Sequence, residues 1–286
     1  MRLGDGGSDN FIDRTGRGGG GGFGGGGNLL GCLLPLVASK FGFVGVAVLL
    51  LGYCALTSLG GGGGLLPGGG SAPTASAPGQ STLSPENRQV LSGVLLSTEQ
   101  VWGDVFKRSG QTYAAPQMVA YSNTDQSGCG TAQSAMGPFY CPTDRRIYID
   151  PQFFSELSRR FQAPGDFAQA YVIAHEVGHH IQNLEGTLDR AQSAQARSST
   201  AAGNAVQVGV ELQADCYAGV WAKRSGLLEA GDIEEGMRAA EAIGDDMLTK
   251  GRVSPDNFTH GTSAQRQEAL NRGLSSGNPA QCNYAR

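Results

Sequence analysis

The sequence contains few charged residues and no long basic run. Only 16% of its 286 residues are charged, the formal net charge is −4, and aromatic residues do not alternate with lysine or arginine. Proteins that bind nucleic acids need clustered positive charge to neutralise phosphates. We therefore expect no nucleic-acid partner.

Side chains that could build a core are scarce in two glycine tracts, residues 16–28 and 60–81. Glycine loses much conformational freedom on ordering and has no side chain to bury, so such tracts rarely fold alone. We predict a disordered, glycine-rich segment at 1–28 and a linker at 60–83. The remaining residues, 84–286, are enough for one globular domain with a sizeable core.

Charge is also missing between the two tracts. Residues 41–59 contain no charged residue, and a helix of that length spans the hydrocarbon core of a bilayer. A buried core helix would not be flanked by glycine on both sides, and a signal peptide would begin closer to the N-terminus. The sequence thus predicts a transmembrane helix in the region 29–59 and a single-pass protein of the cell membrane.

Basic residues set the predicted orientation of this span. Four of them precede it, and none follows until Arg88. By the positive-inside rule the N-terminus then lies in the cytoplasm, and the domain at 84–286 faces the periplasm or the cell exterior.

Four of the six cysteines lie in that exported domain: Cys129, Cys141, Cys216 and Cys282. Four cysteines allow three pairings. We favour Cys129–Cys141, which closes a short loop, and by elimination Cys216–Cys282. Four free thiols are the alternative if the predicted orientation is wrong, because disulfides persist in oxidising compartments.

Residue periodicity predicts an α+β domain that is mainly α. Apolar residues recur at helical spacing through 83–110, with Ser84 as N-cap and Pro85 in the first turn. The turn-rich stretch 116–154 contains short runs that indicate the strands of a small sheet. Further helices are predicted at 166–186, 203–226, 231–251 and 263–275; residues 189–205 either extend one of these helices or form a loop.

The stretch "AHEVGHH", residues 174–180, holds three of the four histidines around one glutamate. His175 and His179 are one helical turn apart, so both rings can reach one cation. Glu176 lies beside them and is placed to take a proton from water without being a ligand, the arrangement found in zinc peptidases. His180 points elsewhere, and we expect it to pack, cap or support.

A third ligand is predicted in "VELQAD", residues 210–215. Glu211 and Asp215 lie one turn apart on a helix whose neighbouring residues are apolar, which argues against an exposed acidic stripe. We expect Glu211 to bind the metal and Asp215 to accept a hydrogen bond from a histidine N–H, with the fourth metal position left for water.

The fourth histidine, His260, lies in "THGTSAQR". It is either a loop or capping residue, or a donor to the tetrahedral oxyanion of a peptide-cleavage reaction, helped by Arg266. The two hypotheses stay open, because sequence does not fix the distance of His260 from the metal.

These motifs together resemble known families. H-E-V-G-H followed by E-L-Q-A-D resembles the glutamate-zincin pattern, and "THGTSAQR" is similar to a T-H-P-x-x-x-x-R element of membrane-bound gluzincins, with glycine in place of proline. Nearly the whole chain resembles the bacterial "putative neutral zinc metallopeptidase" family, through "GDGGSDNFIDRTG", "CGTAQSAMGPFYCPTDRRIYIDPQFF" and the motifs above. The resemblance implies a zincin-like domain, one catalytic Zn²⁺ on His175, His179 and Glu211, Glu176 as catalytic residue, and a protein or peptide substrate.

The leading hypothesis is thus a membrane-anchored zinc endopeptidase in which Glu176 is the general base. The strand expected near 145–150 is a candidate edge for pairing with an extended substrate. A catalytically silent zinc-binding scaffold and a hydrolase of other amides, such as a cell-wall peptide, are the alternatives. Glu176 favours an enzyme over a scaffold, because a pure binding site has no use for an acid that is not a ligand.

Overall fold

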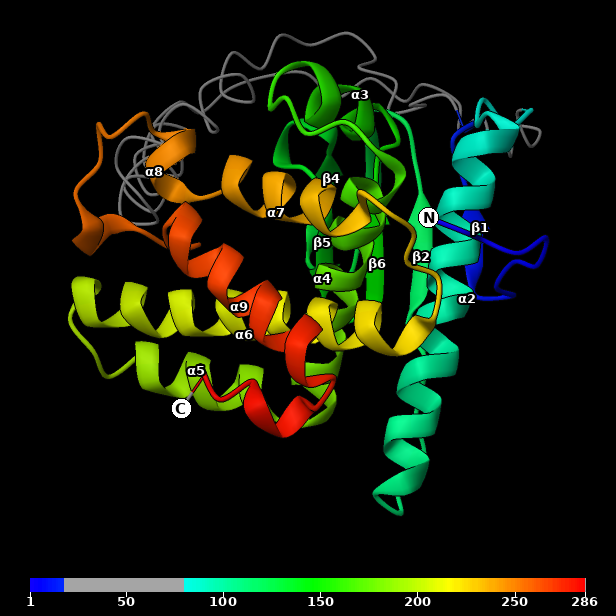
Figure 1. Ribbon diagram of the computed structural model, residues 1–286. Coiled ribbons are helices and arrows are strands. Elements are labelled where there is room, and N and C mark those ends of the chain that lie inside the picture. Colours follow the sequence, from blue (N-terminus) through cyan, green and yellow to red (C-terminus); the bar gives the residue numbers. More distant parts are fainter. Residues whose placement is uncertain (18–79, 286) are drawn as a thin grey trace, which may run out of the picture. The chain divides into compact units, whose positions relative to one another are not determined.

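A computed structural model describes residues 1–17 and 80–285 (Figure 1). The predicted membrane span at 29–59 and most of the predicted linker at 60–83 lie outside the described residues.

Helices make up most of the described chain, and the sheet is small, which confirms the α+β prediction (Figure 1). The helices are Pro85–Arg108 (α2), Gln152–Arg159 (α3), Asp166–Leu184 (α4), Thr187–Gln195 (α5), Thr200–Ser225 (α6), Asp232–Ala242 (α7), Asp245–Leu248 (α8) and Ser263–Ser276 (α9). The strands are Phe11–Asp13 (β1), Gln117–Ala120 (β2), Thr124–Ser127 (β3), Gly130–Gln133 (β4), Phe139–Cys141 (β5) and Arg146–Ile149 (β6).

The prediction of one helix at 231–251 is wrong, because the backbone is extended at Gly244 and divides this stretch into α7 and α8. Local signals do place the start of α2 where the sequence predicts it. Ser84 caps α2, because its side chain accepts a hydrogen bond from the backbone N–H of Asn87, and Pro85 follows in the first turn. The stretch left open at 189–205 divides between two helices: α5 takes its first part, and α6 begins at Thr200.

The main sheet has the strand order β1-β2-β6-β5. β1, β2 and β6 run parallel, and β5 is antiparallel to β6. β6 therefore has a hydrogen-bonded neighbour on each side, so the expectation that this strand offers a free edge to a substrate is wrong. Among the described strands it is β5, packed against α4, that forms this edge of the sheet.

The N-terminal segment is part of this domain. β1 pairs in register with β2, from Phe11 opposite Met118 to Asp13 opposite Ala120. Beside it, the side chains of Ser8 and Asn10 both donate to one carboxylate oxygen of Glu99 on α2, at 2.6 and 2.9 Å. The prediction of disorder is thus wrong for residues 1–17, which are fixed by strand pairing and polar contacts.

The predicted membrane topology also has to be corrected. Among residues 1–17 and 80–285, none of the helices has both the length and the apolar character needed to cross a bilayer. The strand pairing adds a physical constraint. β1 precedes the predicted span and β2 follows it, yet strands that hydrogen-bond in one sheet lie on the same side of a membrane. The predicted single-pass protein, with a cytoplasmic N-terminus and an exported catalytic domain, is therefore wrong.

The centre of the domain is a close contact between α4 and α6. A Cβ atom added to Gly178 would lie only 2.9 Å from the Cα of Ala214, so the two helices touch through backbone at this point. α9 covers another side of α6 (Figure 1). This packing buries large side chains of both helices, including Tyr171 and Trp221, and fixes how the two helices face each other.

Both predicted disulfides are present. Cys129–Cys141 ties the turn of the β3–β4 hairpin to β5. Cys216–Cys282 joins α6 to the C-terminal tail and closes a loop with a sequence separation of 66 residues. A cross-link over a loop of that length stabilises a fold by about 4 kcal/mol in the chain-entropy model.

Glu99 offers a test of the docked N-terminal segment. Glu99→Ala should lower the free energy of unfolding of the full chain by about 1–2 kcal/mol, because two donors lose a charged acceptor. In a chain that lacks residues 1–17 the same substitution should have no effect. Urea unfolding of the four proteins measures both values, and an equal loss in both backgrounds would show that Glu99 does not hold the segment.

Candidate metal centre

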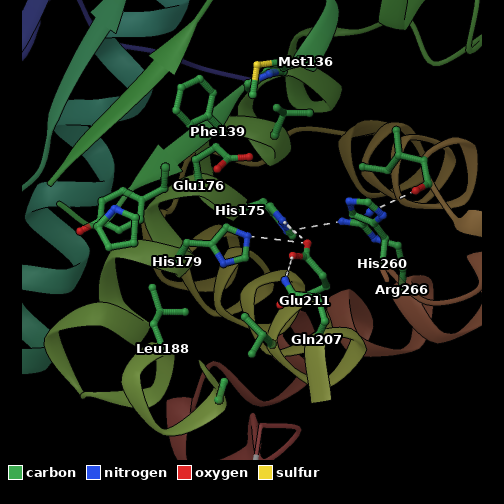
Figure 2. Close-up of a pocket in the computed structure, with 18 of the residues that line it drawn as sticks. Met136, Phe139, His175, Glu176, His179, Leu188, Gln207, Glu211, His260 and Arg266 are labelled. Carbon is green, nitrogen blue, oxygen red and sulfur yellow. Dashed lines mark hydrogen bonds and ion pairs between the residues drawn. The ribbon is translucent and has the colours of Figure 1, made fainter. Parts of the chain in front are cut away.

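The three predicted metal ligands meet between α4 and α6. The Nε2 atoms of His175 and His179 lie 3.2 and 3.7 Å from Oε2 of Glu211. Zinc with ligands at about 2.0–2.2 Å in tetrahedral geometry separates its ligand atoms by about 3.3–3.5 Å. Figure 2 shows both rings directed toward the Glu211 carboxylate. These residues could therefore hold one zinc ion, and their donor set of two imidazoles and one carboxylate suits that metal.

Asp215 fixes the orientation of His175. Its carboxylate lies 2.7 Å from Nδ1 of His175 and accepts a hydrogen bond from the hydroxyl of Tyr171 at 2.6 Å. Arg266 donates to both oxygens of Asp215, at 2.9 Å each. Because Nδ1 is the protonated nitrogen in this arrangement, the lone pair of Nε2 is directed to the metal position.

Arg266 is a partner of Asp215. Its side chain is only 3% exposed, and a third N–H donates to the carbonyl of Ile243. Arg266 also lines the same cleft as His260, so the hypothesis that it helps His260 to stabilise an oxyanion stays a prediction.

The charges of the site favour a bound cation. Burial lowers the pKa of His175, but Asp215 and Glu211 outweigh burial and raise it to about 10. Burial raises the pKa of Glu211, and the two histidines hold it well below its usual range. In the absence of a metal these buried carboxylates thus draw protons onto the imidazoles, and a divalent cation supplies the same positive charge.

The ligands open onto a cleft of about 650 Å³. Glu176, 7% exposed, lines this cleft beside His175 but is not one of the three grouped ligands. Phe139 and Tyr140 of β5 and Leu188 of α5 contribute further lining. Figure 2 shows Glu176 on the side of the histidine pair that faces Phe139.

His260 lies at the rim of the same cleft, in the loop between α8 and α9. Its side chain is half exposed, and its Nδ1 lies 3.2 Å from Oδ1 of Asp245. The other oxygen of Asp245 accepts the backbone N–H groups of Thr259, His260 and Gly261, which holds the loop in place.

Sequence reasoning missed two glutamines of the site. Gln182 lies one turn after His179 and accepts its Nδ1–H at 2.8 Å, and Gln207 lies one turn before Glu211 and donates to its Oε1 at 2.9 Å. Both glutamines stand at helical spacing from a ligand, which is the signal that could have identified them.

His180 has a structural role, as expected. Its Nε2 lies 2.6 Å from the carbonyl oxygen of Ala114, and its Nδ1 accepts from the hydroxyl of Tyr140 at 3.0 Å. These contacts join α4 to the segment before β2 and to β5.

A family model described as "Putative neutral zinc metallopeptidase" matches residues 2–285. The chain belongs to this family. It is 44% identical to the uncharacterized protein YpfJ of Escherichia coli (strain K12), over 96% of this chain and 95% of that protein. It is also 44% identical to the uncharacterized protein Rv2575 of Mycobacterium tuberculosis (strain H37Rv), over 59% of this chain and 62% of that protein. No solved structure matches. The family prediction is thus confirmed.

The burial of His180 predicts how the stability of the fold depends on pH. Burial lowers its pKa from 6.5 to about 4, against the opposing effect of its bond to Ala114. Between these values the unfolded chain binds a proton that the folded chain does not, so stability falls as the pH falls from 6.5 to 4, by up to about 1.4 kcal/mol per pH unit. Urea unfolding of the metal-free chain across this window should show a shallower slope for His180→Gln. Equal slopes for both proteins would contradict a neutral, buried His180.

Proposed function

We propose that the protein is a zinc-dependent endopeptidase in which His175, His179 and Glu211 bind the metal and Glu176 is the general base. The position of Glu176 is the observation that supports this proposal. This residue is a buried acid that adjoins the ligand group, faces the cleft and is not needed to hold a cation. A scaffold that only binds zinc has no use for such a residue, whereas hydrolysis requires it.

Zinc bound here would lower the pKa of a water toward about 7 and polarise a substrate carbonyl. Glu176 then accepts the proton of the attacking water and passes it to the leaving nitrogen of the peptide bond. Gln207 binds Oε1 of Glu211 and so leaves Oε2 toward the histidines. Asp215, held by Arg266, keeps His175 in the protonation state that a ligand needs.

We further propose that His260 donates a hydrogen bond to the oxyanion that forms in the tetrahedral intermediate. Its position in the lining of the cleft onto which the metal ligands open supports this role. Asp245 accepts a hydrogen bond from Nδ1 at 3.2 Å and thereby orients the ring.

The cleft suits an extended polypeptide. β5 lines it and has no partner strand on its outer side among the described residues. An extended substrate segment would add to that edge through backbone hydrogen bonds, which are largely independent of sequence. This arrangement favours a peptide substrate, although metal-assisted attack on another amide uses the same groups.

Glu176→Gln tests the proposed base. In the full chain this substitution keeps the size of the side chain but removes its ability to accept a proton. We expect cleavage of an unfolded protein to fall by at least about 100-fold, the typical contribution of a general base. Zinc content, measured by atomic absorption, should stay at one ion per chain in both proteins.

The full chain is the right sample, because a fragment that begins at residue 84 would lack β1 and its contacts to α2. A Glu176→Gln protein as active as the wild type would rule out the proposed base. One zinc ion in each protein and cleavage in neither would favour the scaffold function.

His260→Ala tests the proposed oxyanion donor. We expect kcat to fall by about 10²–10³-fold, the usual cost of losing one such donor, with KM and zinc content little changed. Asp245→Asn should show a smaller decrease in kcat, because the ring remains but is less firmly held. An unchanged kcat in His260→Ala would show that His260 is a loop residue without a catalytic role.

A further inference from the structure

We propose that Gln182 and Gln213 form an amide relay that orients His179 for metal binding, and that the relay is anchored on the disulfide-bound C-terminal tail. This inference rests on the metal site proposed above. It concerns residues of α4, α6 and the tail that neither bind the metal nor contact a substrate.

The first contact of the relay is direct. Gln182 is fully buried, and its Oε1 lies 2.8 Å from Nδ1 of His179. Its amide nitrogen donates in the opposite direction, to the carbonyl oxygen of Val210 at 2.7 Å and to Oε1 of Gln213 at 3.0 Å. Both hydrogens of this amide are therefore used by α6, across the helix contact.

The second contact reaches the tail. Gln213 donates from its own amide nitrogen to the carbonyl oxygen of Cys282 at 2.8 Å. Cys282 is bound covalently to Cys216, on the ligand helix next to Asp215. The relay thus begins at a backbone atom that the disulfide holds against α6.

The direction of every bond in the relay follows from its ends. Backbone carbonyls only accept, so the carbonyl of Cys282 requires the nitrogen of the Gln213 amide, and the oxygen of that amide then faces Gln182. The carbonyl oxygen of Val210 likewise requires that the amide nitrogen of Gln182 faces it. The oxygen of Gln182 is left to face His179, so Nδ1 of His179 must carry the proton. Its Nε2 then has a free lone pair, directed to the metal position.

The relay also explains why the two histidines have different partners. His175 is oriented by a carboxylate whose charge Arg266 balances. An amide orients His179 equally well without adding a second buried negative charge, which would need its own cation. A carboxylate at position 182 would also face the carbonyl oxygens of Val210 and Gln213, which cannot donate to it.

Zinc affinity of the full chain, measured by competition with a chelator, tests the relay. Gln182→Met keeps the size of the side chain but lacks the acceptor, and we expect affinity to fall by about 10–100-fold, as for other groups that hold a ligand histidine. Gln213→Met should show a smaller fall, because Val210 still orients Gln182. Gln169→Met, on α4 but away from the cleft lining, is the matched control and should leave affinity unchanged.

A purely structural role for Gln182 is distinguished by the conservative variant. Gln182→Glu retains an acceptor for Nδ1–H, so zinc affinity should stay within a few-fold of wild type even though the metal-free protein becomes less stable to urea. In the zinc-loaded wild type, ¹⁵N–¹H spectra of the imidazoles should show a slowly exchanging Nδ1–H on His179. In Gln182→Met this proton should exchange faster.

The relay is overturned if Gln182→Met binds zinc as tightly as Gln169→Met, or if affinity follows stability alone across the variants. A wild-type chain that binds zinc but cleaves nothing would refute the proposed peptidase and leave the relay standing. A wild-type chain without zinc affinity would overturn both.

Discussion

The contact between α4 and α6 is the constraint on which the site depends. α4 carries both imidazoles and Glu176, and α6 carries Glu211 and Asp215, whose carboxylate orients His175. The side chains can converge on one point only because the helices touch through backbone at Gly178 and Ala214. A larger residue at position 178 would push α6 away and move Glu211 out of reach of both rings.

This contact also creates an electrostatic problem, because it brings three carboxylates into a buried space. Arg266 compensates for Asp215, while Glu211 faces the two imidazoles. The raised pKa of His175 and the lowered pKa of Glu211 are two consequences of the same imbalance. A divalent cation bound between the ligands would balance this excess negative charge. Without a cation, the site gains positive charge only when its imidazoles take up protons.

The sequence predicted what is local. H-E-x-x-H and the spacing of Glu211 and Asp215 depend only on the helical repeat, and Ser84 and Pro85 mark the start of α2 through local chemistry. It failed for several contacts whose partners are distant, although the Cys216–Cys282 pairing was predicted correctly. β1 has three residues and forms only because β2 lies beside it. The place of β6 inside the sheet depends on β1, β2 and β5. The hydrogen bonds of Gln182 can be recognised only once Gln213 and the C-terminal tail are in place. The prediction of membrane topology was wrong for the same reason, since a count of charges contains no information on the pairing of β1, before the predicted span, with β2, after it.

The parallel pairing of β1 and β2 has a consequence for the order in which the protein is made. Residues 11–13 are synthesised first, yet their partners at 118–120 follow more than a hundred residues later. β1 therefore cannot pair until β2 has been translated, and β6, on the other side of β2, is translated later still. Contacts so distant in sequence form slowly, because the chain between them loses entropy before any hydrogen bond compensates. We therefore expect the sheet beside the cleft to be completed late in folding, after helices that depend on nearer contacts.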